Sequence, residues 1–442
     1  MRMTFWRWHF YAGLLCIPIV LLLSVTGMIY LFKPQIDNLI DYRYDHLAPL
    51  NHPHDPAREV AAALAAVPGG TFLGYQLPRT ARSAVRVLVD RRGTEIRVFV
   101  DPANFRVLKT VPESERFERI IFKLHGTLLL GNAGSVVVEL TASWAIVLIL
   151  TGLALWLPAP LRAGGLLYPR FGAKGRRFWR DLHGVFGMWA SMIVLFLLIS
   201  GLPWSFAWGN YLKELRAVAG ARHKIDWPVG AVSPRAEIAS AEANMQDMPT
   251  MAPGAPTKPA PASSEALANV VSEVGRLHLA YPVVVMPPRP GHSDWSAMSN
   301  SQDRVLRATV NLSSKGKILS RTDFDQRPLI DQAVGFGVAV HEGRLFGPLN
   351  VAMNMFAALS LIIVCISGVA MWWRRRPASG LGAPPARNSG VSVPVVATIV
   401  VLCLGIPLFC LSLGLVWLTE RLVLRRITPV ADWLGLSATY LD

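Results

Sequence analysis

The sequence predicts a membrane protein with five transmembrane helices, built from two copies of a unit in which a helix, an outer domain and a second helix follow one another. Three observations predict this fold class. The chain of 442 residues is 52% hydrophobic and only 17% charged, whereas soluble domains usually carry about 25% charged residues. It contains five long apolar stretches, and the spacing of its histidines and glycines repeats.

Each apolar stretch has 20 or more residues, which a helix needs to cross a hydrocarbon core of about 30 Å. Glu139 is the only acidic residue inside them. The first stretch follows a basic N-terminus as in a secretory signal, but no small-residue cleavage site follows it, so we expect a retained helix. The five apolar stretches are 10–32, 133–157, 185–208, 351–373 and 391–418.

The formal charge of +15 does not indicate nucleic-acid binding, because the basic residues gather in short loops at the ends of the apolar stretches. Short basic loops lie on the cytoplasmic side of a membrane. We therefore place the N-terminus in the cytoplasm and expect a multi-pass protein of the bacterial inner membrane. The last helix then puts the C-terminus outside, although Arg421, Arg425 and Arg426 argue against that.

The two long hydrophilic segments are then expected outside as small α+β domains, because each pairs a helical pattern with short alternating strands. The strands are expected near 85–111 and 307–322, and the helices near 57–66 and 265–277. The expected segments are the first helix (1–32), the first outer domain (33–122), the second helix (123–158), a basic loop (159–182), the third helix (183–208), the second outer domain (209–340) with a Pro/Ala/Met-rich insertion (245–264), the fourth helix (341–373), a loop (374–390), the fifth helix (391–418) and a tail (419–442).

The chain repeats itself at its histidines. A His-x-x-x-Gly motif begins at His9 and again at His183, and each histidine is followed by another glycine after 18 residues. His125 and His341 are each followed by a glycine after 6 and after 27 residues. Four intervals that agree without a gap indicate a tandem duplication.

Four of the ten histidines occupy these duplicated positions at the ends of the apolar stretches. An ionisable residue in a membrane span is a functional hypothesis by default. With the topology above, His9 and His183 lie near the cytoplasmic face, and His125 and His341 lie near the outer face. The sequence therefore predicts one histidine pair near each face of the membrane.

Two histidines on facing helices can supply both axial ligands of a haem. Gly13 and Gly187 stand four residues after His9 and His183, on the same helical face, where a missing side chain leaves room for a flat macrocycle. No Cys-x-x-Cys-His motif for covalent haem attachment is present. We therefore predict two b-type haems with the four histidines as iron ligands, which would carry electrons across the membrane.

Two other interpretations of the histidines remain open. They could anchor helix ends or bond across helices, or they could bind zinc, which is disfavoured because no cysteine or carboxylate joins either pair at ligand spacing. Four basic residues flank the pairs and could bind haem propionates or could extend toward lipid headgroups. These residues are Arg7, Arg180, Lys123 and Arg344.

Several motifs resemble the PepSY-associated transmembrane family, over roughly residues 1–376. The motifs are WRWHFYAG (6–13), SVTG (24–27), VFVDP (98–102), LHGTL (124–128) and DLHG (181–184). The family includes iron-regulated inner-membrane proteins and siderophore-iron reductases with two membrane-embedded haems and periplasmic PepSY domains. The resemblance implies that haem passes electrons to a ferric siderophore or another ferric chelate in the periplasm, with His9, His125, His183 and His341 as haem ligands.

Some members of the family continue into flavodoxin-like and nucleotide-binding reductase domains. Nothing after Arg376 has a Gly-rich phosphate-binding turn that follows a strand. We therefore expect a separate electron donor, either a cytoplasmic reductase or a membrane quinol. Two alternative functions remain open, a transport component for siderophore or metal and a regulator whose outer domains bind a protein or peptide.

Overall fold

The structure is a computed structural model that describes residues 2–50, 52–156, 164–218, 264–289, 292–384 and 393–436. In this part of the chain five helices are long and apolar enough to cross a membrane, as predicted. They span Met3–Leu31, Gly131–Trp156, Arg176–Trp204, Gly347–Trp373 and Pro407–Arg426. The predicted insertion at 245–264 lies outside the described residues, apart from Ser264, at which helix α9 begins.

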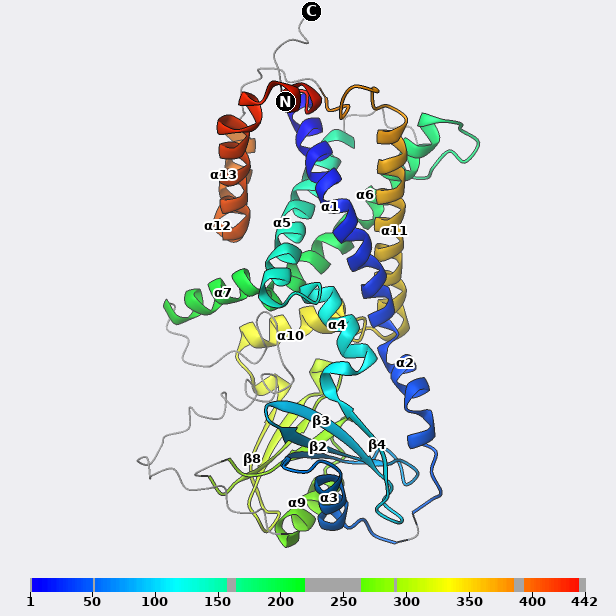
Figure 1. The fold of residues 1–442 in the computed structure, drawn as a ribbon, viewed down its shortest axis with the longest axis vertical. Helices are drawn as coiled ribbons and strands as arrows, with labels where there is room; N and C mark the ends of the chain where they lie inside the picture. Colours follow the sequence, from blue (N-terminus) through cyan, green and yellow to red (C-terminus); the bar gives the residue numbers. More distant parts are fainter. Residues whose placement is uncertain are drawn as a thin grey trace, which may run out of the picture.

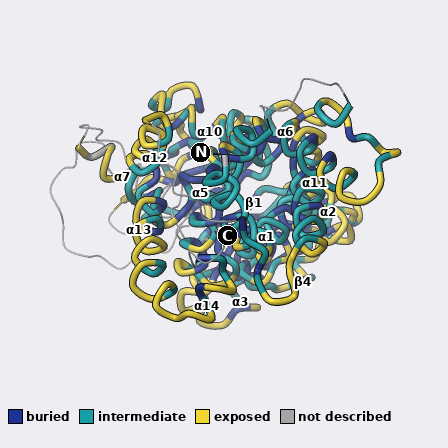
Figure 2. Tube along the Cα trace, turned by 90° about the horizontal axis from the view of Figure 1, so that it is seen from above, coloured by how far each residue is buried: buried dark blue, intermediate teal, exposed yellow. Residues whose placement is uncertain are grey.

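Four of these helices form a bundle above a β-sheet domain (Figure 1). Helix α1 packs against α5 and α11, and α11 packs against α1 and α6. Both helices are apolar on all sides, which suits a helix that contacts other helices on one side and lipid on the other. Seen from above, helices α12 (Val393–Gly405), α13 (Pro407–Leu422) and α14 (Thr428–Trp433) are mostly exposed beside this bundle (Figure 2). The bundle helices are α1 (Arg2–Leu31), α5 (Gly131–Trp156), α6 (Arg176–Gly201) and α11 (Gly347–Trp373).

The predicted fifth helix at 391–418 is not continuous. It is divided into α12 (Val393–Gly405) and α13 (Pro407–Leu422), which pack against each other. The break has a local cause, because Pro407 lacks an N–H and disfavours a helical conformation at the residue before it. Ile406 accordingly has φ −136° and ψ 83°. Helix α12, at about 1.5 Å per residue, is too short to cross a bilayer.

The chain after α13 returns to the N-terminal end of α1, through a short helix α14 (Thr428–Trp433). Arg7 donates a hydrogen bond of 3.1 Å to the carbonyl oxygen of Gly435, and Tyr11 donates one to the carbonyl oxygen of Leu434. Leu434 and Gly435 therefore lie on the same side as the N-terminus. The sequence prediction placed the C-terminal tail on the side opposite to the N-terminus, and this is wrong for the described part of the tail.

The predicted segments 123–158 and 341–373 place His125 and His341 at the start of two membrane helices. The structure does not confirm this. These histidines lie at the ends of two separate helices, α4 (Phe117–Thr127) and α10 (Leu329–His341), which precede α5 and α11. Left-handed residues cause the first break, with φ of 50° at Leu128 and 60° at Leu129. The second break contains Gly343 and Gly347, whose φ values are 73° and 57°.

The strands of both outer segments form one eight-stranded antiparallel sheet, in the order β4-β3-β2-β1-β5-β6-β7-β8. The two halves join where Tyr75 of β1 pairs with Val285 of β5. From this junction each half runs outward in its own sequence order. The strands are β1 (Thr71–Gln76), β2 (Val85–Arg91), β3 (Thr94–Val100), β4 (Val107–Pro112), β5 (Val283–Met286), β6 (Trp295–Ser299), β7 (Ala308–Leu312) and β8 (Ile318–Asp323).

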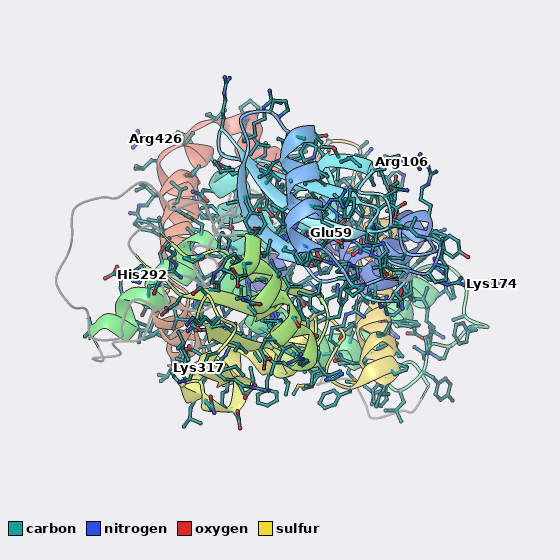
Figure 3. All side chains as sticks on the ribbon, turned by 90° about the horizontal axis from the view of Figure 1, so that it is seen from below. Glu59, Arg106, Lys174, His292, Lys317 and Arg426 are labelled. Carbon is teal, nitrogen blue, oxygen red and sulfur yellow. The ribbon has the colours of Figure 1, made fainter. Side chains whose placement is uncertain are left out.

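Helices α3 (Pro56–Ala66) and α9 (Ser264–Arg276) cover one face of the sheet, opposite to α4 and α10 (Figure 1). Alternate residues of each strand point to this face, so that Val87, Val270 and Trp295 share one apolar core. Viewed from below, Glu59 of α3 lies near the centre of the domain and Lys317 lies at its edge (Figure 3). Glu59 is fully buried and accepts a hydrogen bond of 2.7 Å from the Tyr75 hydroxyl.

The other face of the sheet carries a buried polar network that connects it to α4. Arg97 of β3 donates to Glu113 with an Nε–Oε2 distance of 2.7 Å and to Gln76 at 2.5 Å. Burial alone would raise the pKa of the Glu113 carboxyl, but Arg97 and Arg116 outweigh it and hold that pKa well below its usual range. The stabilisation is therefore present above the ordinary carboxyl pKa and is lost as the pH falls toward the lowered value.

Candidate functional site

The structure brings the four histidines together in two pairs. The ring centres of His9 and His183 are 6.1 Å apart with nearly perpendicular planes. Those of His125 and His341 are 6.4 Å apart. This is the spatial pairing that the predicted topology implies, with one pair toward each end of the bundle.

Each histidine uses its Nδ1 atom in a hydrogen bond to a neighbouring helix. His9 Nδ1 lies 3.0 Å from the Thr151 hydroxyl, and His125 Nδ1 lies 3.0 Å from the Thr26 hydroxyl. His341 Nδ1 lies 3.0 Å from the Ser200 hydroxyl, and His183 Nδ1 lies 2.9 Å from the carbonyl oxygen of Val364. An Nδ1–H that donates in this way leaves Nε2 as the unprotonated nitrogen that can bind a metal.

Ser367 Oγ also lies 3.4 Å from His183 Nδ1, and a glycine follows each of these four hydroxyl-bearing residues and lies against the same imidazole. A Cβ built on Gly27 would lie 3.3 Å from His125 Cε1, and one on Gly152 would lie 3.1 Å from His9 Cε1. The corresponding distance is 3.4 Å for Gly201 to His341 and for Gly368 to His183. A side chain at any of these glycines would press on the imidazole, which explains the repeated glycines at the helix ends.

The separation within each pair fits two axial ligands on one metal. An imidazole nitrogen lies about 2.0 Å from a bound metal and about 1.1 Å from its own ring centre, so two imidazoles on opposite sides of a metal have ring centres about 6 Å apart. Among the described residues no three His, Cys, Asp or Glu side chains gather to hold a metal ion. Two ligands are too few for a structural zinc ion, whereas a porphyrin supplies four nitrogens itself.

A cavity of about 970 Å³ surrounds the inner histidine pair, a volume at the upper end of the range for cofactor pockets. His9 and His183 both line it, together with Gly13 and Gly187. A Cβ on Gly13 would meet its nearest neighbour, Leu148, only at 3.8 Å. The two glycines therefore border open space beside the histidines, as the spacing predicted.

Guanidinium groups line one end of this cavity, near the start of α6. Asp181, fully buried, accepts from Arg170 at 2.6 Å and 2.8 Å and from Arg180 at 3.1 Å, so two of these charges are already paired. The remainder suit the carboxylates of a cofactor. The arginines that line the cavity are Arg170, Arg176, Arg177, Arg180 and Arg375.

Two lining residues also carry buried N–H donors for which the described part of the chain provides no acceptor. They are Trp156 Nε1 and Arg375 Nε. Buried donors without partners are rare and call for an explanation, and an anionic group bound in the cavity would supply one. The residues present here therefore fit a haem.

The four flanking basic residues have different surroundings. Arg180 lines the cavity, but Arg7 instead donates to the carbonyl oxygens of Pro384 and Gly435. Arg344 donates to the carbonyl oxygen of Leu31 at 2.9 Å. Lys123 is half-buried on α4, two residues before His125.

A family model described as the PepSY-associated TM region matches residues 6–375. The chain belongs to the PepSY-associated transmembrane family. The matched region contains all four histidines and ends before α12. No curated protein matches the chain.

The hydroxyl groups that bond the histidines of this PepSY-associated transmembrane protein were not predicted from the sequence. Their signal was present, because a threonine or serine stands before the glycine at the end of all four bundle helices. Glu139 was noted as the only acid in an apolar stretch, and one of its carboxylate oxygens caps a helix. It accepts from the backbone N–H groups of Ala207 at 3.0 Å and Trp208 at 3.1 Å, in the first turn of α7 (Phe206–Val218).

Gly184, the residue after His183, should not tolerate a side chain in this family member. A Cβ there would lie 2.0 Å from Trp156 Cζ3, so Trp156 or His183 must move. We expect Gly184→Ala to destabilise the detergent-solubilised protein by about 1–3 kcal/mol and to disturb the inner pair. Gly126→Ala is the matched control, since Gly126 follows His125 and a Cβ built on it would meet no neighbouring atom within 4 Å. Equal thermal unfolding of both variants would contradict the geometry.

Proposed function

We propose that this protein is a di-haem electron-transfer protein of the bacterial inner membrane, which reduces ferric siderophores or other ferric chelates in the periplasm for iron uptake. The observation that carries the proposal is the repeated geometry of the histidine pairs. Each pair has ring centres 6.1 Å or 6.4 Å apart, with both Nδ1 atoms engaged elsewhere. Two histidines that bind one iron both need an unprotonated Nε2, whereas histidines that only hold helices together do not.

The two pairs lie near opposite ends of the bundle. His9 and Gly27, which packs against His125, are 18 residues apart on α1, which corresponds to about 27 Å along the helix. When bound, haem iron would alternate between the ferric and ferrous states and carry one electron at a time. A chelated Fe³⁺ that accepts this electron becomes Fe²⁺ without any bond to the protein.

The protein residues then have three tasks in this proposal. The four histidines bind iron, the apolar bundle excludes water from the path, and the arginines at the inner cavity neutralise carboxylates. We place the two halves of the sheet in the periplasm as a pair of PepSY-like domains from a duplicated unit. The electron donor is a separate cytoplasmic reductase or a membrane quinol.

The proposal is tested by transfer from the reduced protein to a ferric chelate. Purified protein is reduced with dithionite under anaerobic conditions, freed of excess reductant, and mixed with ferric citrate or a ferric siderophore. We expect reoxidation of the haem with one Fe²⁺ captured by a ferrous-specific chelator for each electron lost. His341→Ala should slow this reaction strongly, while His292→Ala, at an exposed outer-domain histidine, should not.

A haem protein that is not reoxidised by any ferric chelate would contradict the substrate assignment. The transport and regulatory alternatives would then take its place, since neither requires electron transfer.

A further inference from the structure

Four hydroxyl groups occupy equivalent places beside the four histidines. Each hydroxyl donates its own proton to a carbonyl oxygen of its own helix, one turn earlier. The distances are 2.8 Å for Thr26 to Leu22, 2.7 Å for Thr151 to Val147, 3.2 Å for Ser200 to Leu197 and 2.6 Å for Ser367 to Ile363. Because the hydroxyl proton is used within the helix, the oxygen can only accept from the histidine.

This arrangement fixes the tautomer of the imidazole. When the hydroxyl oxygen accepts, Nδ1 must carry the proton, and Nε2 is left free. The hydroxyl also limits rotation of the ring, since Nδ1 is tied at 3.0 Å to Thr26, Thr151 or Ser200. The ring is thus held before any metal is bound.

We propose that Thr26, Thr151 and Ser200 are positioning residues that hold the haem ligands in the iron-binding tautomer and lower the reduction potential of the haems. This inference rests on the proposed function. An acceptor on the second nitrogen makes an imidazole more basic, and a more basic ligand stabilises ferric over ferrous iron. Loss of the acceptor should therefore raise the potential.

All four imidazoles also face the backbone carbonyl three residues before the hydroxyl, at Leu23, Leu148, Leu197 and Val364. The contact is strongest at His183, and this difference of degree provides an internal control. His183 donates mainly to the carbonyl oxygen of Val364 at 2.9 Å, while its distance to the Ser367 hydroxyl is 3.4 Å. Removal of the Ser367 hydroxyl therefore leaves the principal acceptor in place. Ser367→Ala matches Ser200→Ala in chemistry, and Ser367 stands at the position that corresponds to Thr151 in the repeated spacing, but Ser367→Ala should have little effect.

The experiment is a spectroelectrochemical titration of the purified full-length protein, with haem counted per chain. We expect Thr151→Val to raise the potential of one haem, and Thr26→Val and Ser200→Ala to raise that of the other. Changes of ligand support typically alter metal affinity by tenfold or more, and a tenfold change in the one-electron equilibrium is about 59 mV. Thr26→Ser keeps the acceptor and should restore the original potential.

The outcomes separate this inference from the proposed function. A wild-type protein without haem contradicts the proposed function itself. Two haems with unchanged potentials in Thr26→Val, Thr151→Val and Ser200→Ala overturn only the role of the hydroxyls. Loss of a single haem from Thr26→Val but not from Thr26→Ser supports the inference. Equal loss of both haems from every variant, Ser367→Ala included, would indicate a packing role and overturn it.

Discussion

Replacement of His125 by alanine should leave the purified protein with about half of its haem. His341, its neighbour at 6.4 Å, would remain as a single ligand on that site, and a haem held by one histidine is bound more weakly and loses the low-spin spectrum of two nitrogen ligands. The inner pair lies about 27 Å away along α1 and should keep its haem. Haem extraction and the reduced absorption spectrum measure both effects.

The repeat provides matched variants for this result. His9→Ala should remove the other haem, because His9 pairs with His183, and the double variant His9→Ala/His125→Ala should lose both. His46→Ala, at a histidine that stacks on Tyr42 outside the bundle, should retain the full amount. A protein that loses both haems in each single variant would show that the pairs are not independent sites.

Replacement of Arg97 by methionine should destabilise the outer sheet by about 3–5 kcal/mol, the usual cost of removing one partner from a buried ion pair. Glu113 is 1% exposed and would keep Arg116 at 3.3 Å and Arg119 at 3.5 Å as its nearest charges. It would lose the shorter bond of 2.7 Å from Arg97. Limited proteolysis of the full-length protein across a urea series measures the unfolding of the sheet.

Arg321→Met is the control, because the same substitution then falls on β8 at an ion pair whose side chains are 46% and 36% exposed. Exposed pairs contribute about 0–1 kcal/mol. An Arg97→Met protein as stable as Arg321→Met would contradict a stabilising role for the buried Arg97–Glu113 ion pair on the face of the sheet toward α4. Equal destabilisation of α4 and the sheet would further indicate that Glu113 couples them.

The membrane helices could be predicted because hydropathy and length suffice for them. The histidine pairing could be predicted from the repeated spacings and the order of the membrane helices, which together place one pair near each end of the bundle. The prediction of one continuous fifth helix at 391–418 was wrong, although the residue that breaks this helix is visible in the sequence. Pro407 stands in the middle of an apolar stretch, and composition alone does not distinguish a helix that crosses the membrane from two that fold back.

Other features could not be derived from the sequence. Pairing of β1 with β5 joins strands about 200 residues apart, and its register depends on the apolar core beneath both halves. The breaks before α5 and α11 depend on left-handed residues such as Leu128 and Leu129, which carry no conformational preference that would reveal them. The hydroxyls could have been found from the sequence, because the residue before each of the four repeated glycines is a threonine or a serine. Thr26 and Thr151 are two of these residues.

The presence of two haems is tested most directly by the visible absorption spectrum of the detergent-purified protein, air-oxidised and then reduced with dithionite, with haem quantified per chain. We expect about two low-spin b-type haems per chain, bound without covalent attachment. A colourless protein purified from haem-replete cells, with His9, His125, His183 and His341 intact, would contradict this expectation.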